Sequence, residues 1–167
     1  MKNSANEAVR QARLVLAMSK VATLPIQVET IACEHGISVK HLPLDDELSG
    51  MSFVKDGSSI IVVNSSHHSN RQRFTIAHEL GHHILHRSYL VDNVHVDKVI
   101  YRNHKSSDGV HLKEIEANAF AAELLMPAAK VKPYIGTDIN DEARVAAVAK
   151  IFKVSTAAMT IRLNNLS

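Results

Sequence analysis

The sequence has little cysteine, little net charge and no long hydrophobic run, and each shortage excludes a class of protein. Cys33 is the only cysteine in 167 residues, so no intrachain disulfide can form, and its apolar helical surroundings predict a buried side chain. A formal net charge of +2 is too small to indicate a nucleic acid or a membrane surface as partner. Because no stretch has the length of a signal-peptide core or a membrane span, we expect a protein of the reducing cytoplasm.

What the sequence does contain is enough for one folded domain. Hydrophobic residues make up 46% of the chain, and the length allows a sizeable core. Periodicity and turn signals predict helices at about 4–18, 25–34, 69–87, 111–126, 127–134, 139–152 and 155–166. Strands are expected at 37–42, 51–55 and 59–64, with short candidates at 94–96 and 99–101. These elements predict an α+β fold: a short, mostly antiparallel sheet of three to four strands packed on helices, with a helical C-terminal part.

The most informative motif is His-Glu-Leu-Gly-His at residues 78–82, inside the helix expected at 69–87. Two histidines four residues apart project from the same side of a helix, one turn apart. His78 and His82 can therefore reach one Zn²⁺, and Glu79 is placed to take a proton from a water activated by the metal. The alternative is a surface helix with incidental histidines, but its apolar residues recur at helical spacing and indicate a packed helix.

A zinc site needs a third protein ligand, and the sequence near the motif does not supply it. His86 continues the four-residue spacing, but three successive turns cover about 12 Å of helix axis and cannot all reach one ion. His83 points about 100° away from His82 around the helix. The metzincin extension needs Gly at position 85 and His at position 88, where this chain has Leu85 and Ser88.

The third ligand is therefore expected from the helix at 111–126, which is rich in alanine and glutamate. Small alanine side chains let two helices approach closely, as a glutamate would need to reach a metal held by the first helix. From the pattern alone, Glu116 could equally be a ligand or part of a solvated helix surface.

The residues now described resemble the ImmA/IrrE metallopeptidases. The resemblance is carried by RFTIAHELGH at 73–82 and EANAFAAELLMP at 116–127, and it extends to LSGM at 48–51 and to FKVS at 152–155 with the Ala158-Met159 and Arg162-Leu163 pairs. It covers most of residues 25–166. It implies a zincin-like fold in a single metallopeptidase domain over 1–167, with an N-terminal helix (1–24), a catalytic core (25–136) and a C-terminal helical pair like a helix-turn-helix (137–167).

The resemblance also implies a site and a substrate class. His78, His82 and Glu116 would bind Zn²⁺, or Mn²⁺ in its place, and Glu79 would be the catalytic base. The substrate would be a helix-turn-helix repressor of a mobile element or stress regulon, whose cleavage derepresses genes. The chain departs from the wider gluzincin pattern, in which an acidic residue four positions after the glutamate ligand supports a metal histidine, because Phe120 stands there.

Three protein ligands leave a fourth position open, as in catalytic zinc sites. Peptide hydrolysis also uses a second donor to the developing oxyanion. Tyr101 and His104 are candidates in a poorly patterned segment, together with His95 and Tyr89, although the pattern favours a structural or surface role for each of these side chains.

Two other functions remain open from the sequence. The last two helices, joined near Lys153-Val154-Ser155, could form a DNA-binding helix-turn-helix, although the last helix offers only Arg162 as a strong base reader and direct nucleic-acid binding is not favoured. The chain could also be a non-hydrolytic partner of a repressor or toxin, because motif residues establish capacity and not turnover.

Overall fold

The structure is a computed structural model that describes residues 2–19, 23–98, 108–136 and 138–166. The helices are α1 (Lys2–Met18), α2 (Val28–Glu34), α3 (Ser69–Leu85), α4 (Arg87–Asp92), α5 (Asp108–Leu125), α6 (Ala128–Val131), η1 (Lys132–Tyr134), α7 (Glu142–Phe152) and α8 (Thr156–Leu166). The strands are β1 (Ile37–Leu42), β2 (Leu48–Lys55), β3 (Ser58–Asn64) and β4 (His95–Lys98). The predicted α+β class with a helical C-terminal part is confirmed.

The four strands form one mixed sheet in the order β1-β3-β2-β4. β2 pairs antiparallel with both β3 and β4, whereas β1 runs parallel to β3. The hairpin between β2 and β3 turns at Asp56 and Gly57, whose φ angles of 49° and 77° are those of the tight turns that match strand twist. β4 therefore lies at one edge of the sheet, directly beside β2.

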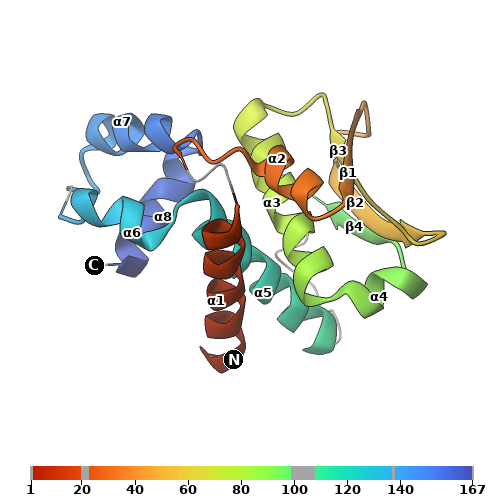
Figure 1. Cartoon of the computed structure of the whole chain (residues 1–167). Helices are drawn as coiled ribbons and strands as arrows, with labels where there is room; N and C mark the ends of the chain where they lie inside the picture. Colours follow the sequence, from red (N-terminus) through yellow and green to blue (C-terminus); the bar gives the residue numbers. More distant parts are fainter. Residues whose placement is uncertain (1, 20–22, 99–107, 137, 167) are drawn as a thin grey trace.

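Helices α3 and α5 form the centre of the molecule (Figure 1). The sheet and α2 lie on one side of them, and α6, α7 and α8 lie on the other. α1 packs along α5. The core is continuous across these layers, from Ile61 and Val63 of β3, through Ile76 and Leu80 of α3, to Phe120 of α5.

Gly81 allows α3 and α5 to pack closely. A Cβ atom added at Gly81 would lie 3.1 Å from Cδ1 of Phe120 and 3.3 Å from the Cα atom of Ala117. Glycine costs about 1 kcal/mol in a helix interior, and here the absence of a side chain lets the facing backbone come into contact. This contact fixes how closely α5 approaches the His-Glu-Leu-Gly-His motif.

The C-terminal helices are joined to the core by a buried ionic cluster. Glu123 of α5 is 2% exposed, and it accepts hydrogen bonds from Arg162 of α8 and from Nε of Arg13 at 2.9 Å. Nε of Arg162 also donates to the carbonyl oxygen of Met126 at 2.9 Å. The one base reader that a DNA-binding interpretation would need is therefore buried inside the protein.

We expect Arg162→Met to lower the free energy of unfolding by about 3–5 kcal/mol, because it leaves the buried Glu123 carboxylate without its main partner. Urea denaturation followed by circular dichroism measures the loss. Arg144→Met is the matched control: Arg144 pairs with Asp141 on the surface, where such a pair contributes less than about 1 kcal/mol. Equal losses in the two variants would contradict a structural role for Arg162.

Two local predictions were wrong, and a third lies outside the described residues. Cys33 is exposed, because it lies on the outer side of the seven-residue α2. The six-residue α4 was not predicted, since it is too short to show a periodic pattern. The strand expected at 99–101 falls in the undescribed segment.

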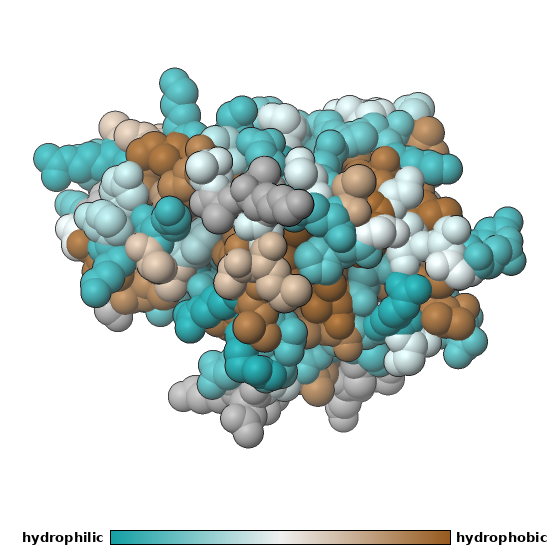
Figure 2. Space-filling model, viewed as in Figure 1, coloured by the Kyte–Doolittle hydropathy of each residue, from teal (hydrophilic) through white to brown (hydrophobic). Residues whose placement is uncertain are grey.

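The surface visible in Figure 2 carries hydrophobic residues in several separate patches among hydrophilic ones. The largest exposed hydrophobic side chains include those of Met18, Val91 and Ile161. Within the described segments, every helix is too short or too polar to cross a bilayer.

Candidate metal centre

Both histidines of the motif are buried and face the same point. The side chains of His78 and His82 are 3% and 1% exposed, and their Nε2 atoms lie 3.1 Å apart. α3 holds them there because residues four apart stack one turn above the other. The two imidazoles therefore lie side by side, as their spacing in the sequence predicts.

Glu114 of α5 completes a triangle with the two histidines. Its Oε2 atom lies 3.4 Å from Nε2 of His78, and its Oε1 atom lies 3.3 Å from Nε2 of His82. Ligand atoms about 2.0–2.2 Å from a tetrahedral metal ion lie about 3.3 Å from one another, which is the edge of the tetrahedron. Each imidazole therefore lies within about one such edge of the other imidazole and of a carboxylate oxygen, so the three side chains can converge on one ion.

Hydrogen bonds on the far side of each imidazole direct a lone pair into this triangle. Nδ1 of His78 lies 3.2 Å from Oδ1 of Asn118 and donates to it, so Nε2 is the nitrogen that is left to bind a metal. Nδ1 of His82 lies 3.1 Å from Nδ1 of His86, whose Nε2 in turn donates to Glu116 at 2.7 Å.

This chain of donors leaves a lone pair on Nε2 of His82, facing Nε2 of His78. Burial lowers the pKa of His82 to about 3, whereas for His78 burial is outweighed by the interaction with Glu114 and neighbouring carboxylates, which raises its pKa to about 9. A proton on His78 thus lies between two nitrogens 3.1 Å apart, beside a carboxylate, and a bound cation can take the place of that proton. The donor set therefore fits a divalent metal.

Glu116, which the resemblance implied as the third ligand, lies outside this cluster and contacts His86 instead. Two residues along a helix correspond to a rotation of about 200°, so Glu114 and Glu116 project in different directions. The position four after Glu114 is Asn118, the residue that supports His78. If Glu114 is the ligand, the supporting position falls on the polar Asn118 and no longer on Phe120.

Glu79 lies beside the cluster in a fully buried position. Ser52 of β2 donates a hydrogen bond to one carboxylate oxygen of Glu79, while the other oxygen, Oε1, is buried without a hydrogen-bond partner among the described residues. Burial raises the pKa of Glu79 to about 8. A carboxylate with a raised pKa can accept and release a proton near neutral pH.

His95 of β4 is the site residue that sequence reasoning ranked too low. It is 8% exposed, and its Nε2 atom is buried with no partner among the described residues, 3.6 Å from Oε1 of Glu79 and 3.7 Å from Glu114. His95 belongs to the group that could hold a metal ion, with His78, His82 and Glu114. The only sequence feature that pointed to His95 was its place in the short strand predicted at 94–96.

The remaining predicted donors are not part of the described centre. Tyr101 and His104 lie outside the described residues. Tyr89, on α4, stacks against the ammonium group of Lys113, 4.8 Å from the ring centroid.

Comparisons with known proteins agree with this geometry. The chain is 33% identical over 122 residues to the radiation response metalloprotease IrrE of Deinococcus radiodurans, in a match that covers 67% of this chain and 32% of that protein. It thus spans about a third of the length of that relative. A solved structure titled Mycobacterium tuberculosis transcriptional regulator shares the fold, with a TM-score of 0.57 at 17% identity over 95% of this chain and 46% of that one.

The family match covers most of the elements that build the centre. The model of the peptidase M78 family, described as the IrrE N-terminal-like domain, matches residues 32–164. That range contains the whole sheet, the motif on α3, the glutamates of α5 and most of the C-terminal pair. The chain therefore belongs to the IrrE N-terminal-like family of metallopeptidases, the ImmA/IrrE family that its sequence resembles.

Proposed function

We propose that this protein is a zinc-dependent endopeptidase whose metal ligands are His78, His82 and Glu114. The observation that carries the proposal is the convergence of two imidazole nitrogens and the Glu114 carboxylate, each about 3.1–3.4 Å from its neighbour, with the buried Glu79 carboxylate beside them. Imidazole and carboxylate ligands also accept Mn²⁺, so either ion could serve. Glu116 then has a supporting role, through His86.

Each buried group has a chemical task in peptide hydrolysis. A bound zinc ion supplies Lewis acidity toward the water and the scissile carbonyl. Glu79 accepts the proton of the attacking water and delivers it to the leaving amine, and Ser52 holds its carboxylate in place. Asn118 and His86 keep the two imidazoles in the tautomer that faces the metal.

His95 is proposed to contact the substrate rather than the metal. Its Nε2 lies 3.7 Å from Glu114, beyond the roughly 3.3 Å edge of a tetrahedral zinc site, and it has a free buried nitrogen beside Glu79. Such a nitrogen can donate to the oxyanion of the tetrahedral intermediate. β4 also forms an edge of the described sheet, where an extended substrate could pair by strand addition.

We expect His95→Phe to lower kcat by about 10²–10³-fold while zinc affinity stays within about threefold of the native value. Peptide-cleavage rates measured at increasing substrate concentration give kcat, and titration against a chromophoric chelator gives the zinc affinity. His41→Phe is the matched control, because His41 is an exposed histidine on the opposite edge strand, β1. A loss of zinc affinity as large as the loss of kcat would make His95 a fourth ligand.

The proposed substrate is a helix-turn-helix repressor in the cytoplasm. Support comes from the family resemblance and from a curated relative named as a radiation response metalloprotease. Cleavage of such a repressor would release the genes that it silences.

The test is to incubate the purified chain with the repressor encoded next to its gene, with zinc and with a chelator. Zinc-dependent fragments, identified by mass spectrometry, are the expected result. A stable complex without fragments would favour a non-hydrolytic partner of a repressor or toxin. Tight, sequence-specific binding of duplex DNA in a gel-shift assay would favour a DNA-binding regulator.

A further inference from the structure

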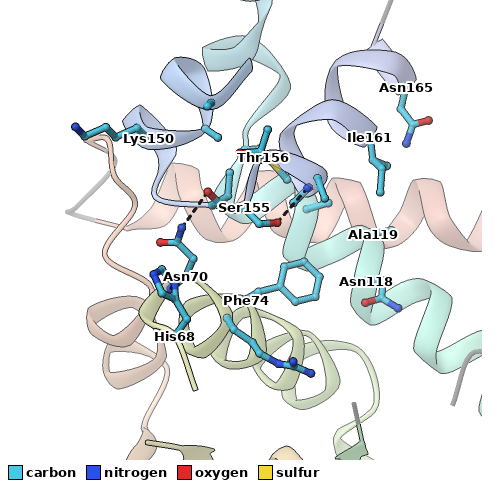
Figure 3. Close-up of a pocket in the computed structure, with 18 residues that line it drawn as sticks. His68, Asn70, Phe74, Asn118, Ala119, Lys150, Ser155, Thr156, Ile161 and Asn165 are labelled. Carbon is cyan, nitrogen blue, oxygen red and sulfur yellow. Dashed lines mark hydrogen bonds between the residues drawn. The ribbon is translucent and has the colours of Figure 1, made fainter. Parts of the chain in front are cut away.

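A groove of about 1020 Å³ lies between the start of α3, the middle of α5 and the α7–α8 pair. Two of its lining residues contact His78 on the side of the ring that faces away from the metal centre. Asn118 lines the groove and hydrogen-bonds to His78, and Phe74 lines it and stacks against the His78 ring at 6.4 Å between centroids. Figure 3 shows Phe74 and Asn118 on the α3 and α5 sides of this space, with Ile161 above them on α8.

The size and lining of the groove indicate a peptide rather than a small molecule. Pockets for drug-sized ligands occupy about 300–1,000 Å³, and the volume of this groove is slightly larger than that range. Its floor is apolar and built from small side chains, including Ala119, Ala122 and Ala158, which leave room for the side chains of an occupant.

The charges at the groove are of one sign. Arg71 and Lys150 line it, and its described lining includes neither aspartate nor glutamate. Both of these side chains belong to exposed residues. An occupant with apolar side chains and carboxylates complements this surface, whereas the phosphates of a nucleic acid would match the cations and leave the apolar floor uncovered.

We propose that this groove binds a segment of the protein substrate away from the scissile bond, and that it selects segments with apolar residues and at least one carboxylate. The inference rests on the proposed peptidase function, which it extends by naming the chemistry of the substrate. The groove and the metal centre lie on opposite sides of the His78 ring, so a bound segment would hold the substrate close to the centre while leaving the ligands free.

The test measures peptide binding separately from cleavage. The probes are two fluorescein-labelled peptides of the same leucine and alanine sequence, one carrying glutamates and the other lysines at the same positions. Fluorescence anisotropy gives Kd for the zinc-loaded full chain carrying Glu79→Gln, which leaves the peptides intact. We expect the acidic peptide to bind at least about tenfold more tightly than the basic one.

Variants locate the binding. Lys150→Glu is expected to weaken binding of the acidic peptide about tenfold, whereas Lys55→Glu, the same charge change on an exposed residue of β2, leaves it unchanged. Ile161→Asp tests the apolar wall against Ile151→Asp, an exposed isoleucine of α7 outside the groove. Unfolding curves of all four variants confirm that each is folded.

Several outcomes would overturn the inference. These are equal Kd values for the two peptides, no binding of either, unchanged binding in Lys150→Glu and Ile161→Asp, preference for a duplex DNA probe, or a dimer in gel filtration that is lost in Ile161→Asp. Chelator-sensitive cleavage of casein by the native chain is measured in parallel. Selective peptide binding without cleavage of casein or repressor would support the groove as a binding site and contradict the peptidase function. Cleavage of casein or repressor without selective peptide binding would support the peptidase function and contradict the role of the groove.

Discussion

Replacement of Glu79 by glutamine is expected to reduce peptide cleavage by about 10³-fold while leaving zinc bound. The amide keeps the size of the side chain and can still accept the hydrogen bond from Ser52. It cannot accept the proton of the attacking water, so the base is lost and the ligand triangle remains. Fragment release measured by mass spectrometry gives the rate, and elemental analysis gives the zinc content.

Glu47→Gln is the control for this experiment, because it makes the same chemical change at an exposed turn before β2. It should cleave at the native rate. Native activity in Glu79→Gln would remove Glu79 from the mechanism. Loss of zinc in Glu79→Gln would instead assign Glu79 to the metal, and the buried Oε1 atom would then be a ligand.

The second large effect separates the two glutamates of α5. We expect Glu114→Gln to weaken zinc binding by more than about 100-fold, because it removes a charged ligand of the triangle. Glu116→Gln is expected to weaken zinc binding by only about tenfold, the range typical of groups that orient a ligand histidine. Competition with a chromophoric chelator measures both affinities, and each variant serves as the control of the other.

The reverse order of affinities would restore Glu116 as the ligand. Equal, small losses would leave the site with two histidines and another third group, for which His95 is the nearest candidate. A further check is the mutual dependence of Glu116 and His86. If Glu116 acts through His86, the double variant with His86→Phe should bind zinc no more weakly than the His86→Phe variant alone.

The sequence could predict those parts of the centre that depend on contacts between residues close together in the chain. His78, Glu79 and His82 are adjacent on one helix, so their spacing alone predicts their arrangement. The choice between Glu114 and Glu116 depends on the rotation of α5 about its axis, which is set by packing of Ala117 and Phe120 on Gly81. No periodicity within α5 contains that information.

The fold shows the same division. The strand 37–42 and the hairpin after it were predicted because alternation and turn residues are local signals. The parallel pairing of β1 with β3 and the position of His95 beside Glu79 arise from contacts between distant segments. The burial of Arg162 against Glu123 is also a long-range contact, whereas the sequence alone presented that arginine as a candidate base reader.

The absence of a side chain at Gly81 sets the spacing between the metal-ligand groups of α3 and α5. The Glu114 carboxylate reaches the histidines only because α5 approaches α3 closely enough for backbone to touch at this point. A methyl group there would push the two helices apart by a few tenths of an ångström and widen the ligand triangle. Bonds of about 2.0–2.2 Å would then span it less well, so the spacing of the ligand groups is set at a position that lies outside the ligand cluster.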